Sequence, residues 1–311
     1  MNDYDVNVNL PRKTNTCAII TIYRPGDEIL EHIEAIMPQV HLMILIINHC
    51  SKEILAALSA KLSDCNRHEI LENPYNMGLA HALNQGLQLA YSASMEWALL
   101  LDQDTCVYKD IIEELSRTID SMPVNPAILG SNYKNKLNHT TAVKCRRHDQ
   151  LYRDKTTVIT SGTMLNLELA KQIGPFRSEY FIDSIDHEYC MRARSLGHGI
   201  YITCKPLMIH TIGLQNDTLL NRLQCLLSQP HLPARKYYVA RNSIANARKF
   251  AIKFPFWSLR QIARIFGDMV ATILFEGQKY QRIKYTLSGL QDGVRNRFIS
   301  GPIETGDAGV R

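Results

Sequence analysis

The sequence lacks the long apolar run of a membrane-spanning helix, because no stretch approaches about 18 consecutive apolar residues. Its N-terminus carries no apolar segment of the kind that a secretory signal has. With 45% hydrophobic and 21% charged residues, the composition excludes a disordered chain and a coiled coil. We therefore expect a cytosolic globular protein, whose 311 residues suffice for one large domain and a sizeable appendage.

Paired cysteines are also missing. The eight cysteines are scattered, and no two of them form a CxxC motif. A structural zinc site is typically built from closely spaced pairs of ligands, and disulfide frameworks form in oxidising compartments. We expect all eight cysteines to be reduced and most of them to be buried.

Glycine-rich phosphate loops are absent as well. Neither GxGxxG nor Gly-Lys-Ser/Thr follows the first apolar run, which argues against a dehydrogenase and a nucleoside triphosphatase. The sequence also shows no recognisable nucleic-acid-binding motif.

Charge is present but unevenly distributed. Residues 1–230 carry 21 basic and 25 acidic side chains, whereas residues 231–300 carry 13 basic and 3 acidic ones. A basic segment of this kind predicts a polyanionic partner, either a membrane surface or a nucleic acid. We predict a main domain at 1–230 and a basic, helical C-terminal module at 231–311.

The first 130 residues alternate between short apolar runs and helical spacings of apolar side chains. The predicted strands are 17–22, 42–47, 69–72 and 97–101, and the predicted helices are 27–37, 52–62 and 76–90. This order implies right-handed crossovers and a mostly parallel sheet. Such sheets bind ligands at the carboxyl ends of their strands, which points to residues 21–24, 48–51 and 102–105.

Two carboxylates stand directly after the fourth predicted strand, in Asp102-Gln103-Asp104. At this place they can share a divalent cation, or one can bind the cation and the other a ribose hydroxyl. Hard oxygen ligands suit Mg²⁺ or Mn²⁺ bridging a pyrophosphate. The alternative is an ordinary acidic surface loop, because such triplets also occur by chance.

A second acidic cluster comprises Asp183, Asp186 and Glu188 within an otherwise apolar stretch. If Asp186 opens a helix, its carboxylate suits the positive end of the helix dipole. The functional interpretation is a general base that deprotonates an acceptor hydroxyl. The alternative is a solvated helix start.

Together with six further segments, these two clusters resemble a known family. The segments are 19–24, 47–51, 76–86, 101–104, 161–163, 181–183, 186–192, His210 and 235–242. In this order they resemble glycosyltransferases of family 2, most closely bacterial rhamnosyltransferases, over roughly residues 15–250. The resemblance implies an α/β fold of the GT-A (Rossmann-like) type, with a mostly parallel sheet flanked by helices.

The resemblance also implies roles for individual residues. Asp104 would bind Mg²⁺ or Mn²⁺ with Asp102 and His210, and Asp186 would be the catalytic base. The nucleotide sugar would contact Thr21, Tyr23, Arg24, Asn48, Asn76, Asn84, Asp102, Gln103, Arg192 and Arg241. Arg235 would neutralise a diphosphate together with Arg241, or simply join the basic surface.

Two positions depart from the family pattern. Asn48 stands where the family usually has an aspartate that accepts the imide N–H of uracil or thymine. An asparagine still accepts through its amide oxygen, but without charge. Ile185 stands where an acidic residue commonly precedes the base, so Asp183 or Glu188 is a candidate to share that role.

The activity implied by the resemblance is inverting transfer of L-rhamnose from dTDP-L-rhamnose to a lipid-linked oligosaccharide. Such an enzyme would act in bacterial O-antigen or other surface polysaccharide assembly, at the inner face of the cytoplasmic membrane. One alternative is transfer of another sugar from a UDP donor. A second alternative, from a different class, is a catalytically silent nucleotide-sugar-binding subunit.

The basic module contains a segment, 254–275, that mixes aromatic, aliphatic and arginine residues. Arg264 and Asp268 interrupt its apolar character, so we expect an amphipathic helix in the headgroup region of an anionic leaflet rather than a span. The alternatives are a helix packed on the main domain and, least favoured, nucleic-acid binding.

Overall fold

The computed structural model describes residues 9–63, 67–136, 139–147, 149–210 and 233–298. Contacts divide the chain into two compact units. The first unit comprises 1–76, 82–176 and 189–211, and the second comprises 77–81, 177–188 and 212–311. The boundary predicted at residue 230 stays a prediction.

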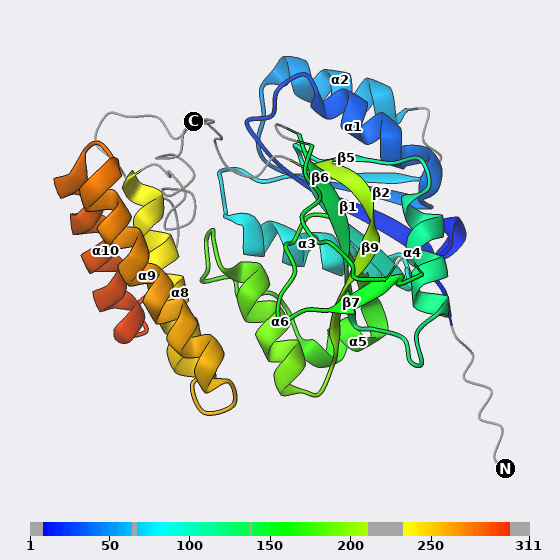
Figure 1. Cartoon of the computed structure of the whole chain (residues 1–311). Coiled ribbons are helices and arrows are strands. Elements are labelled where there is room, and N and C mark those ends of the chain that lie inside the picture. Colours follow the sequence, from blue (N-terminus) through cyan, green and yellow to red (C-terminus); the bar gives the residue numbers. More distant parts are fainter. Residues whose placement is uncertain (1–8, 64–66, 137–138, 148, 211–232, 299–311) are drawn as a thin grey trace, which may run out of the picture. The chain divides into compact units, whose positions relative to one another are not determined.

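Within the first unit, the described residues form a nine-stranded sheet of order β3-β2-β1-β4-β8-β6-β9-β5, with β7 paired to β9 (Figure 1). The strands are β1 (Thr16–Tyr23), β2 (Leu42–His49), β3 (His68–Glu72), β4 (Trp97–Asp102), β5 (Cys106–Val107), β6 (Ile128–Asn135), β7 (Tyr152–Asp154), β8 (Thr163–Asn166) and β9 (Ile200–His210). The four strands predicted from the sequence are confirmed, and they form the contiguous half β3-β2-β1-β4.

This half of the sheet is parallel. Thr21 of β1 lies opposite Ile46 of β2 on one side and Asp102 of β4 on the other. The carboxyl ends of the parallel strands therefore meet at one edge. Beyond β4, the antiparallel strand β8 connects this half to β6, which pairs with β9 in parallel. The predicted α/β fold with a largely parallel sheet is confirmed.

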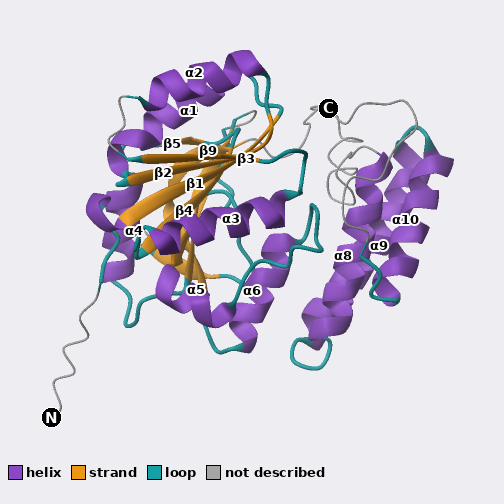
Figure 2. Ribbon diagram, turned by 180° about the vertical axis from the view of Figure 1, so that it is seen from behind, coloured by secondary structure: helices purple, strands orange, loops and turns teal. Residues whose placement is uncertain are grey.

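Helices cover both faces of the sheet (Figure 2). They are α1 (Ile29–Ile36), α2 (Lys52–Leu62), α3 (Leu79–Ser92), α4 (Ile111–Asp120), α5 (Leu167–Ile173) and α6 (Ile185–Ser195), with short 3₁₀ turns at Lys13–Asn15 and Met37–Gln39. Alternate strand residues such as Ile20 and Ile22 pack with α1, α2 and α4 in one core cluster. Ile19, which points the other way, contacts Gly86 of α3.

The second unit contains three helices that pack side by side, α8 (Pro233–Phe250), α9 (Pro255–Phe275) and α10 (Lys279–Val294). Glycines on α10 allow close approach to α8: a Cβ on Gly289 would lie 2.3 Å from the Tyr237 carbonyl oxygen. A buried ion network also joins the helices, because Lys236 of α8 pairs with Asp268 and Glu276. Among the described residues, no helix is long and apolar enough to cross a bilayer.

The structure corrects the prediction that all cysteines are reduced. Cys145 and Cys204 form a disulfide, with their Cα atoms 5.7 Å apart. The antiparallel pairing of β7 with β9 carries the preceding loop back along β9 and so brings the two residues together. A separation of 59 residues leaves no sequence signal for this pair. Cys17, Cys50, Cys106 and Cys190 are free, whereas Cys65 and Cys225 lie outside the described residues.

Helix packing in the second unit predicts whether replacing a glycine by alanine stabilises or destabilises the protein. In an exposed helix, Gly→Ala is stabilising by up to about 1 kcal/mol. At Gly289 the new methyl group would meet the α8 backbone, so we expect Gly289→Ala to destabilise the protein by about 1–3 kcal/mol. Gly277→Ala, in the bend between α9 and α10, is the control for the methyl group itself, because no atom lies within 4 Å of a Cβ at that position. Thermal unfolding of both variants tests this; equal melting temperatures would contradict the packing argument.

Candidate functional site

Asp102, Asp104 and His210 form a cluster in the first unit. One ligand atom from each of them lies within 4.8 Å of the others. Asp102 ends β4, and Asp104 follows in the turn that leads to β5. Because Cys106 of β5 pairs with Ile209 of β9, His210 is brought beside that turn although it is more than 100 residues away. The clustering predicted for these residues is present.

Hydrogen bonds to buried side chains fix the positions of the residues in this cluster. Thr105 Oγ1 lies 2.9 Å from His210 Nδ1 and 2.7 Å from Ser161 Oγ. Ser161 Oγ in turn accepts the backbone N–H of Asp102 at 3.0 Å. Thr105 and Ser161 are almost fully buried, so this chain fixes the histidine ring relative to the β4 turn. The sequence placed both residues in motifs but gave no indication of this supporting role.

The electrostatics of the cluster favour a neutral imidazole. Burial lowers the pKa of His210 below its ordinary value, and the Asp104 carboxylate, 3.6 Å away, opposes this shift more weakly. Asp104 itself is exposed and Asp102 is half-buried. A neutral imidazole and two carboxylates are a donor set that suits Mn²⁺ or Mg²⁺. The residues present therefore fit a divalent cation.

Gln103, between the two aspartates, ties the β4 turn to the end of β1. Its Oε1 accepts the backbone N–H of Tyr23 at 2.7 Å, and its Nε2 donates to the Tyr23 carbonyl at 3.0 Å. His32 of α1 contacts the Gln103 carbonyl at 2.8 Å. The side chain of Gln103 thus fixes the backbone next to Arg24, whose φ of 47° lies in the left-handed region.

Further along the same edge, Asn48 lies near the end of β2 and is almost fully buried. Its Oδ1 accepts a hydrogen bond from Asn73 Nδ2 at 2.9 Å, and Asn73 also exchanges hydrogen bonds with Gln85 of α3. Asn73 was not predicted as a site residue. It comes directly after β3, the weakest predicted strand, and the rule that ligands bind at strand ends would have found it.

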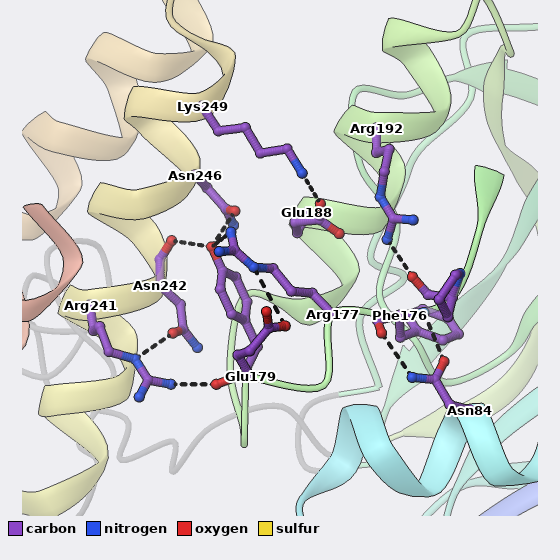
Figure 3. A network of polar contacts seen from close by, with 12 residues as sticks. Asn84, Phe176, Arg177, Glu179, Glu188, Arg192, Arg241, Asn242, Asn246 and Lys249 are labelled. Carbon is purple, nitrogen blue, oxygen red and sulfur yellow. Dashed lines mark hydrogen bonds and ion pairs between the residues drawn. The ribbon is translucent and has the colours of Figure 1, made fainter. Parts of the chain in front are cut away.

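Asn84 and Arg192 support the turn after α5 (Figure 3). Asn84 donates to the carbonyl of Phe176 and accepts its N–H, both at 2.8 Å. Arg192 donates to the carbonyls of Ile173 and Pro175, both at 2.7 Å. Each side chain therefore has a structural role. The predicted donor contacts of these two residues, and those of half-buried Asn76 and buried Thr21, stay predictions.

The three candidate bases lie in the second unit and differ in their partners. Asp183 accepts a two-pronged ion pair from Arg235, with a shortest distance of 2.8 Å. Glu188 is buried and accepts from Lys249 at 2.7 Å (Figure 3). Asp186, the second residue of α6, accepts the backbone N–H of His187 at 2.8 Å. Within the described residues, Asp186 is the member of this cluster without an ion-pair partner.

Polar side chains of α8 hold the segment that precedes Asp186. Asn242 donates to the carbonyls of Ile182 and Asp183, both at 2.8 Å. Asn246 donates to the Ser184 carbonyl at 3.2 Å. Asp183 and Ser184 have φ values of 68° and 58°, a strained pair of left-handed residues that these bonds keep in place.

Arg241 of α8 also bonds to the segment that precedes Asp186. It is completely buried, donates to the Glu179 carbonyl and to Asn242, and lies over the rings of Tyr237, Tyr238 and Phe298. Its predicted contact with a donor stays a prediction. Asn246 and Lys249 were missed by the sequence analysis. Their spacing of four and seven residues from Asn242 along one helix was the available signal.

Comparisons with known proteins agree with this geometry. The model of glycosyl transferase family 2 matches residues 17–174. The dTDP-rhamnosyl transferase RfbF of Shigella flexneri is 25% identical over 297 residues, which cover 91% of this chain and 96% of that protein.

Two solved structures share the fold. Residues 1–349 of S. aureus TarS in complex with UDP-GlcNAc match with a TM-score of 0.52 at 12% identity, covering 91% of each chain. GalNAc-T7 with UDP, GalNAc and Mn²⁺ matches with a TM-score of 0.53 at 13% identity, covering 81% of this chain and 55% of that one.

The cluster predicts that the protein binds a divalent metal ion, and this binding can be measured without any enzymatic turnover. Asp104→Ala removes one hard oxygen ligand, so we expect Mn²⁺ affinity to fall by at least about tenfold. Isothermal titration with Mn²⁺ alone measures this. Asp120→Ala, an exposed aspartate at the end of α4, is the control and should bind Mn²⁺ like the unaltered protein. Equal affinities for the two variants would remove Asp104 from the site.

Proposed function

Because the chain belongs to glycosyl transferase family 2 and has the GT-A fold, we propose that it transfers L-rhamnose from dTDP-L-rhamnose to a saccharide acceptor. The observation that carries glycosyl transfer is the cluster of Asp102, Asp104 and His210 at the carboxyl edge of the parallel strands. The choice of rhamnose is supported by the identity to RfbF, which extends over nearly the full length of both proteins.

Asp102, Asp104 and His210 are the residues that would hold Mg²⁺ or Mn²⁺. A divalent cation there supplies positive charge against the diphosphate leaving group of the donor. The protein supplies rigidity: Thr105 orients the imidazole, and Gln103 keeps the β1 and β4 turns together. A preorganised site of this kind binds charge without the cost of reorganising its own dipoles.

Recognition of the donor base is assigned to polar residues at the carboxyl ends of β1, β2 and β3. Asn48 is the candidate to pair with the thymine imide N–H, since its amide oxygen is a hydrogen-bond acceptor. The hydrogen bonds between Asn73 and Gln85 fix the orientation of the Asn73 amide. Thr21, Tyr23, Arg24 and Asn76 complete the proposed set of donor contacts.

Asp186 is the proposed catalytic base. It takes the proton of the acceptor hydroxyl while the oxygen attacks the anomeric carbon and the nucleoside diphosphate leaves. A single displacement inverts the configuration, and no second carboxylate is needed as a nucleophile. Ion pairing supports this choice, because Arg235 and Lys249 occupy Asp183 and Glu188 while leaving Asp186 without a cation among the described residues.

The proposed acceptor is a lipid-linked oligosaccharide in the assembly of bacterial O-antigen or another surface polysaccharide. The protein would then work at the inner face of the cytoplasmic membrane as a peripheral protein. The excess of basic residues in 231–300 supports an anionic membrane partner, and we include no nucleic acid among the partners.

A UDP-dependent transfer of another sugar is the second candidate, favoured by the structural likeness to TarS with bound UDP-GlcNAc. A thermal-shift panel separates the two, because a ligand that binds the native state raises its melting temperature. We expect dTDP-L-rhamnose with Mn²⁺ to give the largest shift. A larger shift with a UDP-sugar would overturn the choice of donor.

A catalytically silent binding subunit is the third candidate. It predicts donor binding without turnover, whereas a transferase slowly hydrolyses its donor even when no acceptor is present. Release of dTDP from dTDP-L-rhamnose, measured with and without Mn²⁺, therefore distinguishes the two. Metal-dependent release supports catalysis, and its absence despite donor binding supports the silent subunit.

Substitution of the base gives a sharper test. Asp186→Asn keeps the shape of the side chain but removes its ability to accept a proton, so turnover should fall by about 10²–10⁴. Donor affinity should change little, because the loss occurs in the transition state. Steady-state kinetics with the panel's best donor and a soluble acceptor measure both quantities.

Asp183→Asn and Glu188→Gln are the matched controls. Each leaves a cation, Arg235 or Lys249, without its ion-pair partner, so we expect a lower melting temperature for both. Turnover at a temperature where they remain folded should exceed that of Asp186→Asn. If either control loses more turnover than Asp186→Asn, that residue is the base.

A further inference from the structure

Helix α9 exposes a continuous row of large apolar side chains. The row, which we call the apolar face, consists of Phe256, Leu259, Phe266, Val270, Ile273 and Leu274. Successive members from Phe256 to Ile273 are three, seven, four and three residues apart, and Leu274 follows Ile273 directly. At about 3.6 residues per turn, all six lie on one side of the helix. Phe256 is 86% exposed, and Ile252, in the turn before the helix, is 96% exposed. Such a row in water indicates an interaction surface.

The opposite side of α9 is the one that packs inside the second unit. Its buried residues are Ser258, Gln261, Ile265, Ala271 and Thr272. These are small or polar, apart from Ile265. The amphipathic pattern of α9 is therefore inverted: more apolar surface faces outward than inward. Packing within the described part of the chain does not explain the apolar face.

Charges around the apolar face are of one sign. Arg260 and Arg264 lie beside it, are exposed, and have no acidic partner among the described residues. The two carboxylates of this region, Asp268 and Glu276, instead pair with the buried Lys236 of α8. Internal ion pairing thus removes the negative charges from the surface and leaves the positive ones outside.

We propose that the apolar face of α9 inserts into an anionic lipid bilayer, with Arg260 and Arg264 at the level of the headgroup phosphates. A helix of 21 residues lying in the membrane plane presents about 30 Å of this face to the acyl chains. The aromatic residues Phe256 and Phe266 supply apolar area, and the arginines supply attraction to anionic headgroups. This surface deepens the proposed function, which includes a lipid-linked acceptor, by naming the residues that meet the lipid.

A second copy of the chain is the competing occupant. Helices that pair through an apolar row place complementary charges beside it. A second α9 would bring arginines and no exposed carboxylate, so the flanks of such a pair would be uncompensated. An anionic bilayer offers the opposite charge, which is why the observations favour lipid.

Cosedimentation with vesicles tests the proposal. The unaltered protein should bind vesicles of phosphatidylglycerol and phosphatidylcholine more tightly than vesicles of phosphatidylcholine alone. Added salt should weaken that binding, since exposed charges are screened within about 8 Å at physiological ionic strength. Failure of the unaltered protein to bind the anionic vesicles would overturn the proposal.

Two double variants separate the apolar and the electrostatic contributions. Phe256→Ser with Phe266→Ser should weaken binding to anionic vesicles by about a hundredfold or more. Arg260→Gln with Arg264→Gln should weaken it by roughly thirtyfold and reduce its salt dependence. All four side chains are exposed, so both variants should keep the circular dichroism spectrum of the unaltered protein.

Matched controls come from the first unit. Leu196→Ser with Val124→Ser removes two exposed apolar side chains, 55% and 62% exposed, that are not on α9. Lys109→Gln with Arg146→Gln removes two exposed cations from that unit. Both controls should bind vesicles like the unaltered protein. Equal losses in the controls and the α9 variants would mean that binding is nonspecific, which would overturn the assignment to α9.

Tryptophan fluorescence reports directly whether α9 contacts the acyl chains. The protein has two tryptophans: Trp97 is buried in the first unit, and Trp257 is partly exposed beside Phe256 on α9. Vesicles with brominated acyl chains should quench the emission, and Trp257→Phe should abolish the quenching. Quenching that persists in Trp257→Phe would place the lipid contact elsewhere.

Two further measurements keep this proposal separate from its alternatives. Sedimentation equilibrium should find a monomer; a dimer that Phe256→Ser with Phe266→Ser dissociates, together with no vesicle binding, would assign the face to a second copy. Release of dTDP without vesicles should be equal in all variants. Vesicle binding without any release would contradict the proposed function while leaving the lipid surface intact.

Discussion

The parallel pairing of β1 with β2 and β4 is the constraint from which the rest of the site follows. Parallel strands that share a register end at the same edge, so Thr21 and Asp102 lie opposite each other. Polar side chains at the ends of these strands and in the turns after them therefore lie at one edge of the sheet, where α/β sheets bind ligands. Gln103 joins the β1 and β4 turns through the backbone of Tyr23, which converts two neighbouring loops into one rigid support.

The antiparallel pair of β5 and β9 adds the third residue of the cluster, His210, to the two aspartates at the end of β4. β5 is only two residues long, yet its pairing with β9 delivers His210 to the aspartates of the β4 turn. Thr105 and Ser161 then fix the ring from the buried side. The geometry of the cluster therefore depends on hydrogen bonds between segments more than 50 residues apart, and a change in any of them would alter the site without touching its ligands.

In the second unit, most carboxylates of the described residues have ion-pair partners, whereas Asp186 has none. Arg235 and Lys249 pair with Asp183 and Glu188. Lys236 pairs with Asp268 and Glu276, and Arg282 also pairs with Glu276. Burying such charges is tolerable only when each has its partner. Two consequences follow from this pairing: Asp186 has no cation partner among the described residues, and the charged side chains exposed on α9 are the arginines Arg260 and Arg264.

The sequence by itself determined the fold class and the composition of the site. Apolar runs marked the four parallel strands, and Asn48, Asp102 and Asp104 stand directly after these runs or one turn beyond them. These features are local: a strand and its following turn are adjacent in the chain, so spacing and residue type suffice to find them. The asymmetry of charge was equally visible, because it needs only counting.

Tertiary structure alone decided which groups meet. It joined Cys145 to Cys204, brought Asn73 to Asn48, and gave Asp183 and Glu188 cations while Asp186 received none among the described residues. It also showed that Arg241 is buried and that the apolar residues of α9 face outward. These outcomes depend on contacts between distant segments, whose energies are set by burial and pairing in three dimensions, and a linear pattern of residue types does not contain them.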